Sequence, residues 1–180
     1  MTKPTYIIEF NSRGSNALTE NESIVADLAP GDAAAINLAA TQSAYQTSAL
    51  LCKMTYTVNW NSFIPLEYKK FRCSFIFRSD IMALSTATYL NENGLISMNI
   101  LKTNIFNGSE LSNNIGMIYP VVASANTRTY YNSSAGDNPT FEMLYPTNQQ
   151  ITISIKHFND NLPLSYLPQY ILYLTMEVIE

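Results

Sequence analysis

Apolar and polar residues alternate most clearly near the end of the chain. Residues 151–155 read Ile-Thr-Ile-Ser-Ile, the period-two pattern of a strand with one buried face. Residues 170–179 alternate less regularly but are rich in Tyr, Ile and Leu. A long apolar strand with an open edge is an aggregation hazard, so it needs a neighbour. We therefore expect it to pair with the strand-like terminus at residues 5–10.

Two strands in the middle of the chain show the same pattern. Residues 49–60 alternate polar side chains with an apolar set that we expect to face the core: Met54, Tyr56, Val58 and Trp60. Residues 68–78 place four side chains on one face: Phe71, Cys73, Phe75 and Phe77. The opposite face, with Ile76 as an exception, and the start of this strand hold a basic cluster: Lys69, Lys70, Arg72 and Arg78.

The rest of the chain reads as shorter strands between polar connections. Further strands are predicted at 23–28, 33–40, 95–102, 115–125 and 141–145, with Pro120 marking a bulge or an edge. Loops are predicted at 11–22 (a loop or extended arm), 61–67, 103–114 and 126–138. Residues 79–93 have the composition of one or two helical turns. We expect the loops at 103–114 and 126–138 to face outward or toward neighbouring molecules.

These elements predict an all-β fold in one domain, residues 1–180. Nine or ten strands joined by long connections are typical of a Greek key and not of an up-and-down meander. A two-sheet antiparallel sandwich of jelly-roll topology is the first choice. An immunoglobulin-like sandwich comes second, because Cys52, Trp60 and Cys73 are too close together for the spacing of that fold.

Composition adds a surface that is polar but weakly charged. Charged residues make up only 13% of the chain, and apolar residues 47%. Desolvating amides and hydroxyls costs less than desolvating charges, so such a surface favours protein contacts. The net charge is −4 and no basic arm is present, so we expect no direct contact with nucleic acid. The basic cluster is either a solvated strand face or a docking patch for an acidic partner.

The two cysteines and the first ten residues bear on the cellular compartment that we expect for the chain. We expect Cys52 and Cys73 to be free buried thiols, although their pairing stays open at this point. The first ten residues do not form a signal peptide, since their apolar run is short and interrupted by Glu9. No run is long enough for a membrane span.

No motif in the chain indicates catalysis, a cofactor or a metal. The single histidine, His157, closes the strand at 151–155 and has no nucleophile motif to serve. We therefore expect no enzyme activity, and no catalytic, cofactor-binding or metal-binding residues. Tyrosine is frequent, with 12 copies, and Tyr130 and Tyr131 in the predicted loop at 126–138 are candidate contacts for a protein or a glycan. The alternative is that most tyrosines are half-buried strand residues.

The strand at 5–10, the polar segment after it, the irregularly spaced strands and the strand at 170–179 together resemble the single jelly-roll capsid proteins of viruses. The resemblance is to the penton and minor capsid type of double-stranded DNA viruses. It implies self-association, commonly as five copies, contacts with a major capsid protein, and no catalytic residues. It also implies a virion location after assembly in the host cytoplasm or nucleus.

A binding module is the competing class. It would be a carbohydrate-binding sandwich, or a trimeric ligand of the tumour-necrosis-factor or C1q kind, with a glycan or host receptor as partner. Such modules are usually secreted, and the expected absence of a signal peptide argues against this class.

Overall fold

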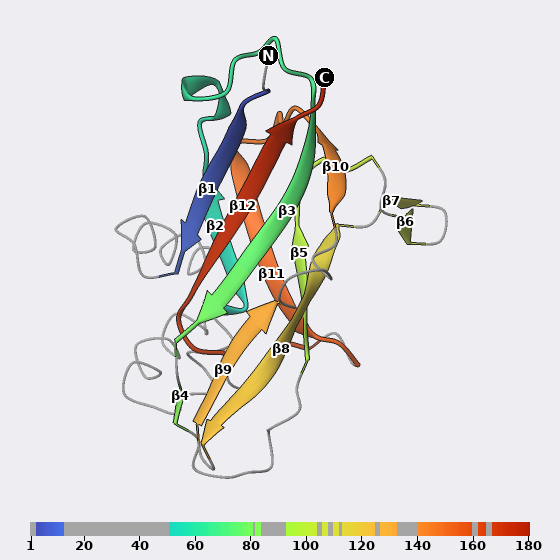
Figure 1. Cartoon of the computed structure of the whole chain (residues 1–180). Coiled ribbons are helices and arrows are strands. Elements are labelled where there is room, and N and C mark those ends of the chain that lie inside the picture. The colour runs from blue at the N-terminus through green and yellow to red at the C-terminus, as the bar shows by residue number, and fades with distance from the viewer. Residues whose placement is uncertain are drawn as a thin grey trace, which may run out of the picture.

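The computed structural model describes residues 3–12, 51–80, 82–83, 93–103, 106–107, 110–111, 113–124, 127–132, 140–159, 162–164 and 167–180. This part of the chain is all-β, with antiparallel ladders and a 3-10 helix, η1 (Trp60–Ser62) (Figure 1). The strands predicted at 23–28 and 33–40 and the arm beyond Ser12 lie outside the described residues. So does most of the segment 79–93, where Met82–Ala83 form the short strand β4.

Strand pairs of the described residues are nested one inside the other along the chain, and four of these pairs build the two layers of the fold. The outer pairs are β1 (Thr5–Asn11) with β12 (Tyr170–Val178), and β2 (Lys53–Thr57) with β11 (Gln150–His157). The inner pairs are β3 (Lys70–Ser79) with β10 (Phe141–Leu144), and β5 (Gly94–Met98) with β8 (Asn114–Ser124). First pairs with last, second with next to last, and so on inward, as in a long hairpin that is wrapped around a core.

Two further ladders assemble these pairs into two layers. Pairing of β12 with β3 gives a first layer in the order β1-β12-β3-β10, and pairing of β11 with β5 gives a second in the order β2-β11-β5-β8. Strand β9 (Thr127–Asn132) pairs with β3 and β8 and joins the layers along one side (Figure 1). This is the order of a jelly roll, so the predicted fold is confirmed.

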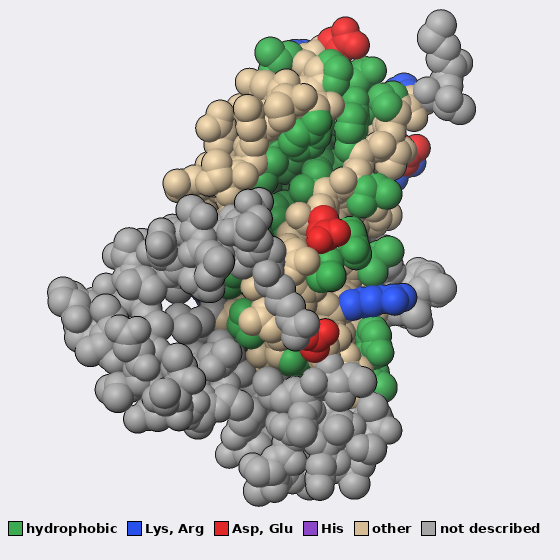
Figure 2. Space-filling model, turned by 90° about the vertical axis from the view of Figure 1, so that its left-hand side faces the viewer, with side chains coloured by type: hydrophobic (Ala, Val, Ile, Leu, Met, Phe, Trp, Pro, Cys, Tyr) green, Lys and Arg blue, Asp and Glu red, His purple; other side chains and the backbone are tan. Residues whose placement is uncertain are grey.

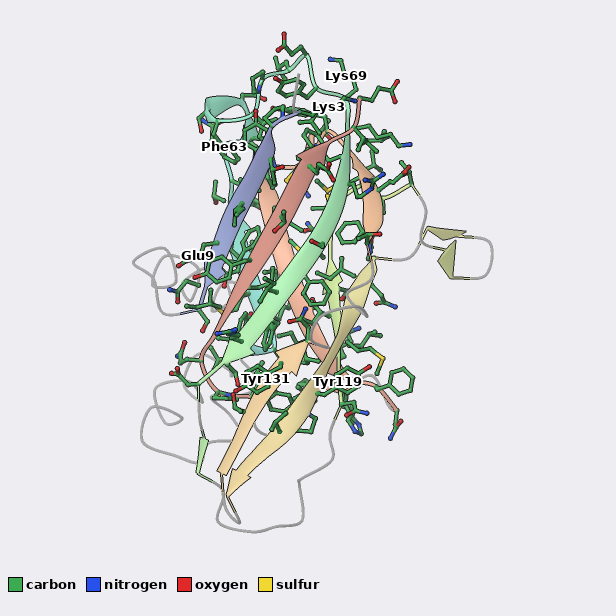
Figure 3. The ribbon with its side chains drawn as sticks, in the orientation of Figure 1. Lys3, Glu9, Phe63, Lys69, Tyr119 and Tyr131 are labelled. Atoms are coloured by element: carbon green, nitrogen blue, oxygen red, sulfur yellow. The ribbon has the colours of Figure 1, made fainter. Side chains whose placement is uncertain are left out.

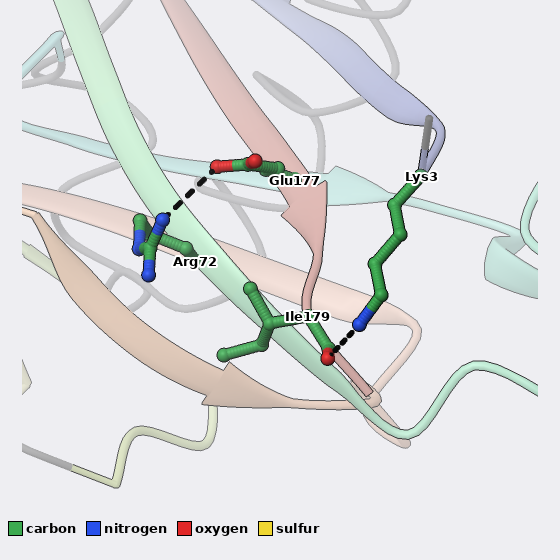
Figure 4. Close-up of polar contacts among 4 residues, drawn as sticks. All are labelled: Lys3, Arg72, Glu177 and Ile179. Atoms are coloured by element: carbon green, nitrogen blue, oxygen red, sulfur yellow. Dashed lines mark hydrogen bonds and ion pairs between the residues drawn. The ribbon is translucent and has the colours of Figure 1, made fainter. Parts of the chain in front are cut away.

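The pairing of the two terminal strands agrees with the expectation from sequence. The β1–β12 ladder runs from Thr5 opposite Glu177 to Asn11 opposite Ile171. Lys3 adds a hydrogen bond from its Nζ to the carbonyl of Ile179 (Figure 4). The long apolar strand β12 therefore has a ladder on both sides and leaves no edge open.

The core lies between the layers and uses the faces that the alternation predicts. Phe71, Cys73, Phe75 and Phe77 are at most 1% exposed, and the isoleucines of β11 are fully buried. Phe10 on β1 meets Tyr56 on β2 with ring centroids 5.1 Å apart, which joins the two layers directly. Trp60 is also buried, but in η1 and not in the strand predicted for it, and its Nε1 donates to the carbonyl of Asn148 at 2.7 Å.

Two predicted loops contain strands. The segment 126–138 holds β9, whose six residues pair with β8, so the loop prediction is wrong there. Residues 127–132 read Thr-Arg-Thr-Tyr-Tyr-Asn, without a regular alternation of apolar and polar residues, so the sequence pattern does not indicate the strand that pairing with β8 and β3 forms. The segment 103–114 holds a small hairpin of β6 (Phe106–Asn107) and β7 (Glu110–Leu111), which the sequence Asn107-Gly108 could have indicated.

Candidate functional site

The predicted basic cluster does not form one positive patch. Lys70 pairs with Glu142 on β10, Nζ to Oε2 at 2.5 Å, and Arg72 pairs with Glu177 on β12, Nη1 to Oε2 at 3.5 Å (Figure 4). Each acid lies on the strand next to its cation, so the charges largely cancel. The basic cluster therefore presents less positive charge to an acidic partner than its sequence suggests.

The two other cations of the cluster differ. Lys69 is exposed and donates through its Nζ to the carbonyl of Leu66, three residues earlier. Arg78 is exposed near the end of β3, and no carboxylate of the described residues lies within ion-pair distance of it. Among the described residues, Lys69 and Arg78 are therefore the two cations of the cluster without an acidic partner, and Arg78 is the one that lies within a strand.

The paired tyrosines of β9 point in opposite directions. Tyr130 is fully buried in the core, so its predicted surface location is wrong, whereas Tyr131 is 40% exposed. Asn132 anchors the end of this strand. Its Oδ1 accepts from the amide of Phe77 at 2.8 Å, and its Nδ2 donates to the carbonyl of Phe75 at 2.7 Å. These two hydrogen bonds extend the contact between β9 and β3, because the β9–β3 ladder itself contains one residue pair, Arg78 opposite Tyr131.

Two shallow clefts flank residues 146–148 in the connection between β10 and β11. One, of about 230 Å³, is bordered by Trp60, Leu66 and Tyr145; the other, of about 300 Å³, by Asn99 and Leu101. Among the described residues that line the two clefts none is charged, and five are Asn or Gln: Asn61, Asn99, Asn113, Asn148 and Gln149. Tyr145 donates to Asn61 Oδ1 at 2.7 Å, which sets the amide at the cleft wall. Such walls suit an uncharged polar ligand.

A third cleft, of about 350 Å³, lies at the end of β3 and β12 and is bordered by Arg78, Asp80 and Gln169. Ser12 closes one side of this end of the sheet. It donates through Oγ to Gln169 at 2.6 Å and accepts from the amide of Tyr170 at 2.8 Å. These bonds hold the sheet margin together rather than arrange a reacting group.

The structure also buries a lysine that the sequence analysis did not single out. Lys102 follows β5, is 2% exposed, and bridges to Met143 of β10. Its Nζ donates to the carbonyl of Asn114 at 2.9 Å and lies 5.9 Å from the centre of the Phe141 ring. Burial lowers the pKa of this amine from 10.5 to about 7. Sequence did hold a signal, because Lys102 continues the inward series Ile96, Met98 and Ile100.

The remaining candidate residues have structural positions. Cys52 and Cys73 are buried thiols that are not joined in a disulfide, as expected, and burial raises the pKa of Cys73 to about 12. His157 ends β11 and donates its backbone amide to the carbonyl of Leu162. Within the described ranges, no three His, Cys, Asp or Glu residues gather to hold a metal ion, and no helix is both long and apolar enough to cross a bilayer.

Comparisons with known proteins add little to what the strand pairing shows about the fold. No protein-family model matches the chain, and no curated protein matches it. Among solved structures, a chain of a full particle of Israeli acute paralysis virus heated to 63 degrees is 8% identical, with a TM-score of 0.23, over 98% of this chain and 72% of that chain. That TM-score is too low to establish a shared fold, so the fold rests on the ladders described above.

Proposed function

We propose that this chain is a structural subunit of a virion, a single jelly-roll capsid protein of the penton or minor capsid type. In this proposal it associates with copies of itself and with the major capsid protein, and it catalyses no reaction. The observation that carries the proposal is the nested pairing of β1 with β12, β2 with β11, β3 with β10 and β5 with β8. Jelly rolls of this kind are common in viral capsids and in lectins.

The character of the surface favours the shell subunit over the other users of this fold. Apolar side chains stand on the outer faces of both layers, among them Ile7 at 68%, Ile76 at 45% and Val121 at 46% exposure. Seen from the side of β1, the described surface shows hydrophobic side chains along much of its length and few charged ones (Figure 2). A surface of this kind is easily desolvated and suits a subunit that is packed among neighbours.

Mass measurements on the full chain test the proposal. Sedimentation velocity and native mass spectrometry from about 1 µM to 1 mM should show self-association, with electron microscopy showing closed rings, five copies being the expected number. When the material from which the chain is obtained is separated on a density gradient, the chain should be found in the fractions that contain particles. A strict monomer at every concentration, found only in the soluble fractions, would overturn the proposal.

The uncharged clefts beside residues 146–148 favour one second candidate, a glycan-binding module. Amide groups and aromatic rings are what neutral sugars contact, and Asn61, Tyr145 and Gln149 lie along one cleft. A glycan array followed by titration would test it. Binding that disappears in Asn61→Ala and Gln149→Ala, but persists when the exposed Lys156 of β11 is changed to Ala, would support this function. An array without signal would remove it.

A further inference from the structure

The outer face of the first layer carries apolar and aromatic side chains where a solvated strand face would be polar. Two rows of cross-strand neighbours run over it: Glu9, Tyr173 and Ile76, and then Asn11, Ile171, Arg78 and Tyr131. Ile76 and Tyr131 are 45% and 40% exposed, and Ile171 and Tyr173 are half-buried. We call this set the outer-face patch: Glu9, Ile76, Arg78, Tyr131, Ile171 and Tyr173.

The patch holds one acid and one base on opposite sides of its apolar centre. Glu9 lies on β1 and Arg78 on β3, with β12 between them (Figure 1). Asn11 donates to Glu9 at 3.2 Å, and the charge of Glu9 is the main reason that the pKa of Tyr173 is raised. No described residue makes an ion pair with Glu9 or with Arg78, whereas Lys70 and Arg72 on the same strand as Arg78 both have acidic partners.

This arrangement is self-complementary under a two-fold rotation. Strands β1 and β3 run parallel to each other on either side of β12, and Arg78 lies one row beyond Glu9 along them. The midpoint between the two charges therefore falls on β12, between Ile171 and Tyr173. When two such faces are stacked, a two-fold axis that lies in the plane between them, over this midpoint and perpendicular to the line from Glu9 to Arg78, places Glu9 of each copy opposite Arg78 of the other.

We propose that two copies of the chain pack face to face through the outer-face patch, so that Glu9 of each copy meets Arg78 of the other. The inference rests on the proposed self-association and names a two-fold contact that is separate from the contacts that close a ring. Ile171, Tyr173 and Ile76 supply the apolar centre, and Tyr131 lies at its rim (Figure 3). The second copy supplies the opposite charge that each of the two groups lacks in the described part of one chain.

The size of the face sets the strength of the contact. The nine residues of β12 extend about 30 Å, and four adjacent strands cover about 19 Å, which gives a flat area of about 600 Å². Stable specific complexes bury about 800 Å² per partner. The pair should therefore be weak and should persist where copies are concentrated.

Charge reversal with mixing tests the proposal, using sedimentation equilibrium of the full chain. Glu9→Arg and Arg78→Glu should each weaken self-association about tenfold or more, because each variant then places like charges opposite each other. Mixed in equal amounts, the two variants should associate with each other at least as strongly as the unchanged chain does with itself. The matched control is Lys156→Glu, an exposed charge reversal on β11 in the other layer, which should change nothing.

The outcomes separate this inference from the proposed function. If the chain forms rings but neither reversal weakens the pairing of two copies or of two rings, the outer-face patch is not a contact, and the shell proposal stands. If both reversals weaken a pair that mixing restores, yet no larger assembly and no particle association is found, the patch stands and the shell proposal fails. Circular dichroism of each variant must show the unchanged β fold for either result to count.

Discussion

Replacing Lys102 by Met should stabilise the protein, by an amount that depends on pH. The ammonium is buried, and its Nζ donates to the carbonyl of Asn114 at 2.9 Å. No described carboxylate lies within ion-pair distance of it. Met has nearly the same length and shape, so it can occupy the space beside Phe141 without a charge to desolvate.

The size of the effect follows from the pKa. A value lowered from 10.5 to about 7 means that the fold is less stable by about 4 kcal/mol at pH 7 than it would be with a neutral group there. Losing the hydrogen bond to Asn114 costs about 1–2 kcal/mol. Lys102→Met should therefore raise the free energy of unfolding by about 2–3 kcal/mol at pH 7.

The sign with pH is fixed by the direction of the shift. Between pH 7 and pH 10.5 the unfolded chain binds the proton and the folded chain does not, so stability of the unchanged protein rises with pH in this window. Below pH 7 both states bind it, and the loss is complete. The advantage of Lys102→Met should accordingly be largest at and below pH 7 and should vanish or reverse near pH 10.

Urea unfolding followed by fluorescence of Trp60, the single tryptophan, measures this directly between pH 6 and pH 10. Lys156→Met, on an exposed position of β11, is the control and should shift the free energy of unfolding little at any pH. Parallel curves for Lys102→Met and the unchanged protein over this range would refute the reasoning, because they would mean that the buried amine is not the group that titrates.

Three other outcomes follow from the packing. Asn132→Ala should lower the free energy of unfolding by about 2–4 kcal/mol, since it leaves two buried backbone groups of β3 without their hydrogen bonds. The control is Asn99→Ala, which removes two hydrogen bonds of the same kind to the backbone of β11 at an exposed site. In the same urea experiment it should cost less than half as much. Gly94→Ala would place a Cβ 2.7 Å from Ile118 Cγ1 and should cost about 1–3 kcal/mol, with Ile118→Ala partly relieving it in a double-mutant cycle. Cys73 should resist a thiol reagent at pH 8 in the folded protein and react only after unfolding, and reaction of the folded protein would contradict its burial.

Much of the fold could be predicted because period-two alternation reports which face of a strand is buried. It assigned the inward residues of β2 and β3 correctly, and the open-edge argument assigned β1 to β12. Strand β9 was missed because its place depends on β8, which pairs with it from Ile118 opposite Asn132 onward. The ion pairs of Lys70 and Arg72 could not be predicted either, since both acids come from strands that lie far from β3 in sequence.

The departures from alternation carry information of a different kind. The inward series of β5, Ile96 and Met98, continues beyond the strand through Ile100 to Lys102, so a lysine lies where alternation requires an apolar residue. The outward series of β3 places Ile76 on the surface, where alternation requires a polar residue. The sequence therefore marks both residues as exceptions to the pattern of a simple sandwich, but it does not show which groups their side chains contact. The structure supplies that answer for Lys102, in the carbonyl of Asn114 and the ring of Phe141. For Ile76 the described residues supply only neighbours on the same face, which is why a second copy of the chain is the partner we propose.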